Sequence, residues 1–266
     1  MSNLPKLQTL QTLQKQSSIS FLDGKNVFVF DTETTGLPLG SPSGWGSYWD
    51  YRMTDKYQTS RIVSIAWSYI NNFSKEKLNT NTGTGTNTNT NTYTIQHHLR
   101  YPEGFTEIPT THIHGISYND TLEKGLTLSM ILDTYGLGKA LLDAEYIIAH
   151  NVGFDYHVLM NELYRLGGQI GGQMAEQCMT HLKSLKDNGK LICTGEISTD
   201  ICKMEFPKRA NSSGNIINNT YLGKKRKIYK MPKLCELYRY YYGKDFENAH
   251  SADGDVKALL ECLRMM

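Results

Sequence analysis

Two acidic residues, Asp31 and Glu33, follow directly after the apolar run Val27-Phe-Val-Phe30. A short apolar, β-branched and aromatic run bounded by turn residues is typical of a buried strand. Because strand side chains alternate between faces, both acids are expected to project from the same side. Neighbouring carboxylates repel one another unless a cation lies between them, and their oxygens suit Mg²⁺ or Mn²⁺. The pair is therefore a candidate metal site, although two solvated acids at a strand end would give the same pattern.

A third acid, Asp155, ends the segment Ala149-His-Asn-Val-Gly-Phe-Asp155, and a fourth, Asp255, ends His250-Ser-Ala-Asp-Gly-Asp255. Both are predicted to lie in the first turn of a helix. Taken singly, each has an ordinary structural explanation, since helix N-termini favour acids, Asp253 can serve as a cap and His250 as a surface residue. Independent structural roles explain poorly why four acids in three segments lie at strand ends or helix starts beside a histidine.

Together these segments resemble the DEDDh family of 3′-to-5′ exonucleases, which includes the proofreading subunit of bacterial DNA polymerase III. Residues 27–38 resemble its first motif and carry Asp31 and Glu33. The second motif supplies Asp155, and the third has His250 five positions before Asp255. The resemblance covers about residues 24–266. It implies an α/β fold of the RNase H-like kind, a mixed β-sheet flanked by helices in a single domain, and hydrolysis of DNA or RNA to nucleoside monophosphates.

The resemblance also implies cofactors and catalytic roles. Two Mg²⁺ or Mn²⁺ ions would lie at the site, with Asp31 bridging both. Glu33 and Asp255 would complete the site of the first ion, and Asp155 would hold the second, largely through water. His250 would act as the general base, which suits a group that titrates near neutral pH.

Five further residues are substrate-binding candidates on the same basis. Leu37 would wedge against the terminal base, and the backbone near Thr34 and Gly36 would hold the 3′ hydroxyl. His114 begins a short stretch, residues 114–117, that resembles a substrate-side loop, and Asn151 lies in the second motif. The implied partner is nucleic acid with a single-stranded 3′ end, and a polymerase is a candidate protein partner.

The remaining elements predicted from periodicity fit an α/β domain. Strands are expected at about 61–69, 93–100 and 146–148, and helices at 122–143 and 155–166. Two C-terminal helices are expected from the apolar spacing at residues 234–241 and 253–266.

The chain of 266 residues is long enough for one good core but too short for two large domains. Residues 1–20 are polar and predicted to form a flexible arm, followed by an exonuclease domain at 21–266. Residues 79–92 form an Asn/Thr repeat that is too uniform to pack, so we predict a disordered insertion. No CxxC pair or apolar run of about 20 residues is present, which argues against a zinc ribbon or a membrane span. We expect an intracellular protein, cytoplasmic or nuclear.

The net charge of +2 gives no indication of nucleic-acid binding, so any basic surface must be local. The run Lys224-Lys-Arg-Lys227 could contact a phosphate backbone, act as a nuclear-import signal or form a solvated loop. Two other functions remain open: a nucleic-acid-binding polymerase accessory without activity, and a phosphatase with an aspartate nucleophile. The latter would need a second Asp where Glu33 stands. Nothing in the sequence separates DNA from RNA as the substrate.

Overall fold

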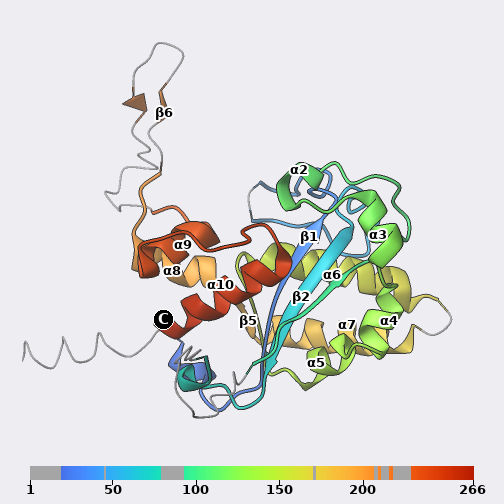
Figure 1. Ribbon diagram of the computed structural model, residues 1–266, viewed down its shortest axis with the longest axis horizontal. Coiled ribbons are helices and arrows are strands. Elements are labelled where there is room, and N and C mark those ends of the chain that lie inside the picture. The colour runs from blue at the N-terminus through green and yellow to red at the C-terminus, as the bar shows by residue number, and fades with distance from the viewer. Residues whose placement is uncertain are drawn as a thin grey trace, which may run out of the picture.

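A mixed five-stranded sheet lies at the centre of the computed structural model, with strand order β3-β2-β1-β4-β5 (Figure 1). Strand β1 (Val27–Thr34) pairs antiparallel with β2 (Ile62–Ile70) and parallel with β4 (Tyr146–Ala149). Strand β3 (Gln96–Leu99) pairs antiparallel with β2 at one edge, and β5 (Leu191–Cys193) pairs parallel with β4 at the other. The predicted mixed α/β sheet is confirmed, with β1 at its centre.

The structure describes residues 19–44, 46–78, 93–169, 172–206, 209–210, 216–217 and 229–266. The predicted N-terminal arm lies almost wholly outside these ranges, although Ile19 is described and fully buried. The Asn/Thr-rich insertion at 79–92 and the basic run at 224–227 also lie outside them. In the described part of the chain, no helix has the length and apolar character needed to cross a membrane.

Two helical layers cover the sheet, and alternate residues of β1 face each layer. Phe28 and Phe30 join the core formed with α5 (Leu137–Asp143), α6 (Val152–Gly167) and α7 (Gln173–Asp187). Val27 and Val29 join the core formed with α9 (Leu234–Tyr242) and α10 (Ala252–Met265). Because side chains alternate along a strand, Asp31 and Glu33 continue the row that faces α10.

The remaining elements are short. Helices α2 (Thr111–His114), α3 (Tyr118–Lys124) and α4 (Leu128–Asp133) precede α5, and α8 (Thr194–Cys202) follows β5. Two 3₁₀ turns occupy Ser20–Leu22 and Lys75–Leu78, and a separate hairpin pairs β6 (Arg209–Ala210) with β7 (Ile216–Ile217).

The single helix predicted at 122–143 is wrong, because the chain forms the end of α3, then α4 and α5. The Gly125 N–H ends α3 by donating to the Thr121 carbonyl. Thr127 then caps α4 through its side chain, which accepts from the Met130 N–H, and Gly136, with φ 82°, precedes α5. Each break therefore has a local cause, an N-cap threonine or a glycine at a helix terminus.

Candidate metal centre

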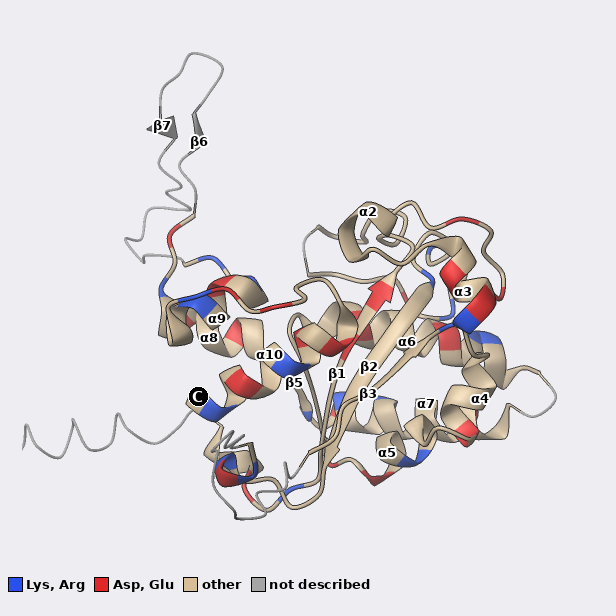
Figure 2. Cartoon of the chain, viewed as in Figure 1, with Lys and Arg blue, Asp and Glu red and all other residues tan. Residues whose placement is uncertain are grey.

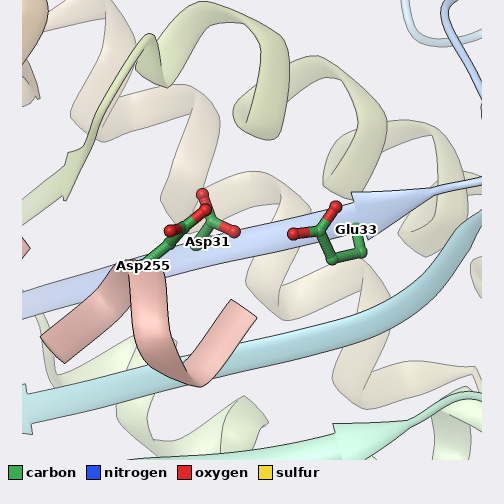
Figure 3. Close-up of side chains that lie close together, drawn as sticks. All are labelled: Asp31, Glu33 and Asp255. Carbon is green, nitrogen blue, oxygen red and sulfur yellow. The ribbon is translucent and has the colours of Figure 1, made fainter. Parts of the chain in front are cut away.

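Three carboxylates from two elements meet beside the centre of the sheet. Asp31 and Glu33 project from β1 toward α10, whose first turn carries Asp255 (Figure 3). One carboxylate oxygen from each of the three lies within 4.8 Å of the others. Among the described residues, this is the one group of three or more His, Cys, Asp or Glu side chains gathered so closely. The alternation predicted for Asp31 and Glu33 thus places both acids on the face that α10 covers.

The acids of this cluster raise one another's pKa. Burial raises the pKa of Asp31 well above its usual value, and the charges of Asp155, Asp255 and Glu33 raise it further. Burial, together with the charges of Asp255 and Asp155, raises the pKa of Glu33 to about 8. Burial likewise raises the pKa of Asp255 to about 7. Without a cation the site therefore resists full ionisation at neutral pH.

The oxygen Oδ2 of Asp31 is buried and has no hydrogen-bond partner among the described residues. A buried acceptor without a partner is uncommon and calls for an explanation, such as an ion. Three carboxylates close together with an unpartnered oxygen are a donor set suited to a hard divalent cation. The residues present fit a divalent metal ion.

Asp155 reaches the same region from the opposite helical layer. It lies in the first turn of α6, is only 3% exposed, and its oxygen Oδ1 accepts from the backbone N–H (3.1 Å) and the hydroxyl (2.7 Å) of Thr32. Burial raises the pKa of Asp155 to about 7, although the bonds from Thr32 oppose the shift. Asp155 is outside the group of three within 4.8 Å, but its charge acts on Asp31. Thr32, between the two strand acids, thus fixes the fourth acid.

The exposed His250 precedes α10 in a strained turn. Asn248 and His250 both have positive φ, 58° and 65°, a region that few non-glycine residues adopt. A Cβ on Gly254 would lie 2.3 Å from the Asn248 carbonyl oxygen, so the glycine allows this turn to pack against α10. A backbone hydrogen bond from His250 to Asp255 opposes the upward pKa shift of that acid. Backbone strain of this kind is common at functional sites.

The predicted substrate residues lie around the end of β1. Leu37 is 73% exposed, and the Thr34 hydroxyl donates to the Gly36 carbonyl at 2.8 Å. Thr110 donates to the Thr34 carbonyl and lies 3.0 Å from Nε2 of His114. Burial lowers the pKa of His114, and the nearby charge of His250 lowers it further. The structure therefore brings His114, His250 and the β1 terminus to the same side of the molecule.

The sequence analysis missed two features beside the site. Tyr48 lies against the start of α6, where its hydroxyl donates to Oδ1 of Asn151 at 3.3 Å. A buried ion-pair network joins Glu162 of α6 to Arg61 and Arg100. Neither feature has a motif or spacing that could reveal it, since the partners lie 62 to 103 positions apart and meet only in the fold.

The fold resembles those of solved exonucleases. It matches Escherichia coli exonuclease I bound to a dT13 oligonucleotide with a TM-score of 0.52 and 14% identity, over 91% of this chain and 40% of that one. It matches a 3′-exonuclease that recognises the 3′ end of a histone mRNA stem-loop with a TM-score of 0.50 and 12% identity, over 98% and 70%. The chain thus spans about 40% of the length of exonuclease I.

These likenesses concern the fold, because sequence identity is low. No family model and no curated protein matches the sequence. The expected single α/β domain of the RNase H-like kind is confirmed by the strand order and by these neighbours. An acidic cluster compatible with metal lies on β1 and α10 of that fold, where Figure 2 shows acidic positions along both elements.

Proposed function

We propose that the protein is a divalent-metal-dependent 3′-to-5′ exonuclease that releases nucleoside monophosphates from DNA or RNA. The observation that carries this proposal is the convergence of Asp31, Glu33 and Asp255 within 4.8 Å, together with a buried Asp31 oxygen that has no partner among the described residues. The structural neighbours support the same class of activity, since exonuclease I was solved with an oligonucleotide. The motifs follow the order found in the DEDDh family, which supports cleavage in the 3′-to-5′ direction.

The acidic side chains have the role of holding the metal ions. Asp31, Glu33 and Asp255 would bind Mg²⁺ or Mn²⁺, and Asp155 would hold a second ion through the oxygen that Thr32 does not engage. Bound ions of this kind activate water and stabilise the charge that develops on phosphate and leaving group. Asp31, on which the charges of Asp155, Asp255 and Glu33 all act, would contribute to both ion sites.

His250 is the general base of the proposal. His250 is exposed, and its backbone hydrogen bond to Asp255 holds the turn next to one of the acids. It would accept a proton from the attacking water while the water oxygen bonds to phosphorus. The bond from phosphorus to the 3′ oxygen of the adjoining nucleotide then breaks, and that oxygen takes up a proton. We expect His250→Ala to reduce kcat by about 100-fold, the usual contribution of a general base, with metal binding retained.

The exposed Leu37 contacts the terminal base, and the backbone at Thr34 and Gly36 holds the 3′ hydroxyl. His114 and Asn151 line the same end of the sheet and contact the terminal nucleotide. The basic run at 224–227 and a polymerase partner remain predictions from the sequence.

A matched set of substrates tests the proposal. Single-stranded DNA, duplex DNA with a 3′ overhang and RNA are each labelled at the 5′ end and incubated with Mg²⁺ or Mn²⁺. We expect a ladder that shortens by one nucleotide from the 3′ end, and no covalent phosphoaspartate. Binding without cleavage on all three substrates with either metal would overturn the exonuclease function in favour of a non-catalytic binding protein.

A further inference from the structure

Between β1 and β2, the described residues 39–44 and 46–60 form a segment, the 39–60 segment, that is fixed against helix α6. Its carbonyl groups accept hydrogen bonds from α6: the Tyr51 carbonyl from Nδ2 of Asn161 and the Thr54 carbonyl from Nη2 of Arg165, both at 2.6 Å. Within the segment, the buried Tyr57 donates its hydroxyl to the Trp49 carbonyl at 2.6 Å. The segment thus has a defined path beside the helix that carries Asp155.

The ring of Tyr48 lies on the first turns of α6. It stacks on the imidazole of His157, with ring centroids 4.9 Å apart and planes 18° apart. A Cβ on Gly153 would lie 2.8 Å from Cε2 of Tyr48, a distance that real side chains do not tolerate. The glycine in Asn151-Val-Gly-Phe-Asp155 therefore leaves the space that the tyrosine ring occupies.

The imidazole of His157 supports the Tyr48 ring because the orientation of the imidazole is fixed. Burial lowers the pKa of His157 to about 4, so the imidazole is neutral at physiological pH. Nδ1 lies 2.6 Å from the Gly153 carbonyl and must carry the proton, since a carbonyl only accepts. Nε2 then accepts from the Lys186 ammonium at 3.1 Å. Both ring nitrogens are engaged, which fixes the plane on which Tyr48 stacks.

The hydroxyl of Tyr48 reaches Asn151, the N-cap residue of α6. It donates to Oδ1 at 3.3 Å, while Nδ2 of Asn151 bonds to none of the described residues. Asn151 has φ 69° and is half-buried at the end of β4, four positions before Asp155. With one lone pair of its oxygen engaged, the amide keeps two N–H donors and a single acceptor lone pair for a ligand.

We propose that Tyr48 is a positioning residue that holds the Asn151 amide with its N–H groups directed at the nucleic-acid strand. Amide donors recognise phosphate and sugar oxygens, the contacts that set the register of a strand without reading its bases. This inference rests on the proposed exonuclease function and adds a residue from outside the acidic motifs. Tyr48 acts through Asn151 and touches no reacting atom.

The substitution Tyr48→Phe removes the hydroxyl and keeps the stacked ring. We expect KM for a single-stranded oligonucleotide to rise about 3- to 10-fold, the value of one hydrogen bond, with kcat within about twofold. Tyr51→Phe is the matched control, because Tyr51 lies in the same segment and its hydroxyl bonds to none of the described residues. We expect its KM and kcat to match the unmodified protein.

A double-mutant cycle separates positioning from a general structural effect. If Tyr48 acts through Asn151, Asn151→Ala raises KM by itself, and adding Tyr48→Phe changes it no further. An unchanged KM in Tyr48→Phe, or additive effects in the double variant, would overturn the inference while the unmodified protein still cleaves. Absence of cleavage by the unmodified protein would instead overturn the proposed function.

Discussion

Two buried carboxylates of this molecule have opposite surroundings. Glu162 on α6 is fully buried between Arg61 and Arg100, with Oε1 2.7 Å from Nε of Arg61 and Oε2 2.5 Å from Nη1 of Arg100. Burial alone would raise its pKa, but the two arginines outweigh burial and lower the pKa to about 2. Asp31 is buried among other acids, and its pKa is raised.

This difference indicates which acid needs a cation from outside the chain. Glu162 has its countercharges within the fold and links the start of β2, the end of β3 and α6. Asp31 has no basic partner among the described residues, and one of its oxygens has no hydrogen bond. This contrast supports a structural role for Glu162 and the proposed metal-binding role of Asp31.

The largest expected effect on activity comes from Asp31→Asn. Turnover should fall on the order of 1000-fold or more. The variant loses a carboxylate that would hold metal ions at the reacting phosphate. The free energy of unfolding without metal should stay the same or rise, because the substitution removes a buried acid from a cluster of acids. Nuclease assays and urea unfolding test the two parts. Near-normal turnover would contradict the metal assignment.

Glu162→Gln should show the reverse pattern. Removing one partner of a buried ion pair leaves uncompensated charge on Arg61 and Arg100, and costs about 3–5 kcal/mol of unfolding free energy. Urea unfolding measures this loss. Glu145→Gln, which breaks the exposed pair with Lys25, is the control and should change stability little. Equal losses of unfolding free energy in Glu162→Gln and Glu145→Gln would contradict the structural role of Glu162.

Metal should stabilise only one of the two regions. At 100 times its Kd, an ion that binds the folded state adds about 2.7 kcal/mol, which corresponds to roughly 5–10 °C in Tm. We expect this rise with Mn²⁺ or Mg²⁺ for the unmodified protein and for Glu162→Gln, and none for Asp31→Asn. Thermal scans with and without chelator provide the measurement, and a rise in Asp31→Asn would locate the ion elsewhere.

For each carboxylate taken singly, the smallest effect is the pH dependence of the metal-free protein. Because the folded-state pKa values of Glu33, Asp155 and Asp255 are raised above their unfolded values, the folded state binds more protons. Stability should therefore fall as pH rises, by about 1 kcal/mol between pH 6 and 8 for each carboxylate that titrates there. Urea unfolding at several pH values tests this, and saturating metal should remove the slope. A rise in stability between pH 6 and 8 would contradict this prediction.

Much of the site could be predicted because its signals are local. The alternation along β1 placed Asp31 and Glu33 on one face, and Asp155 lies in a first helical turn as expected. The strands at 62–70 and 146–149 and the C-terminal helices also follow from apolar periodicity. These features depend on neighbours within a few positions in the chain.

The rest depends on contacts between distant segments. No periodicity identified α7 or β5, and the apolar spacing across 122–143 predicted one helix where glycines and an N-cap threonine divide the chain. The Arg61–Glu162 pair and the Tyr48–Asn151 bond join residues about 100 positions apart, so only the folded chain brings them together. The structure explains Gly153 by the ring of Tyr48, which occupies the space that a Cβ at this position would need.

The attachment of the 39–60 segment has a consequence for protein engineering. Since α6 binds this segment through the main-chain carbonyls of Tyr51 and Thr54, its exposed side chains can be exchanged without loss of those bonds. A library randomised at exposed positions such as Leu39 and Met53 should retain the segment's path. If the protein acts on nucleic acid as proposed, selection from such a library offers a route to variants with a different preference among nucleic-acid substrates. The acidic cluster would stay unchanged.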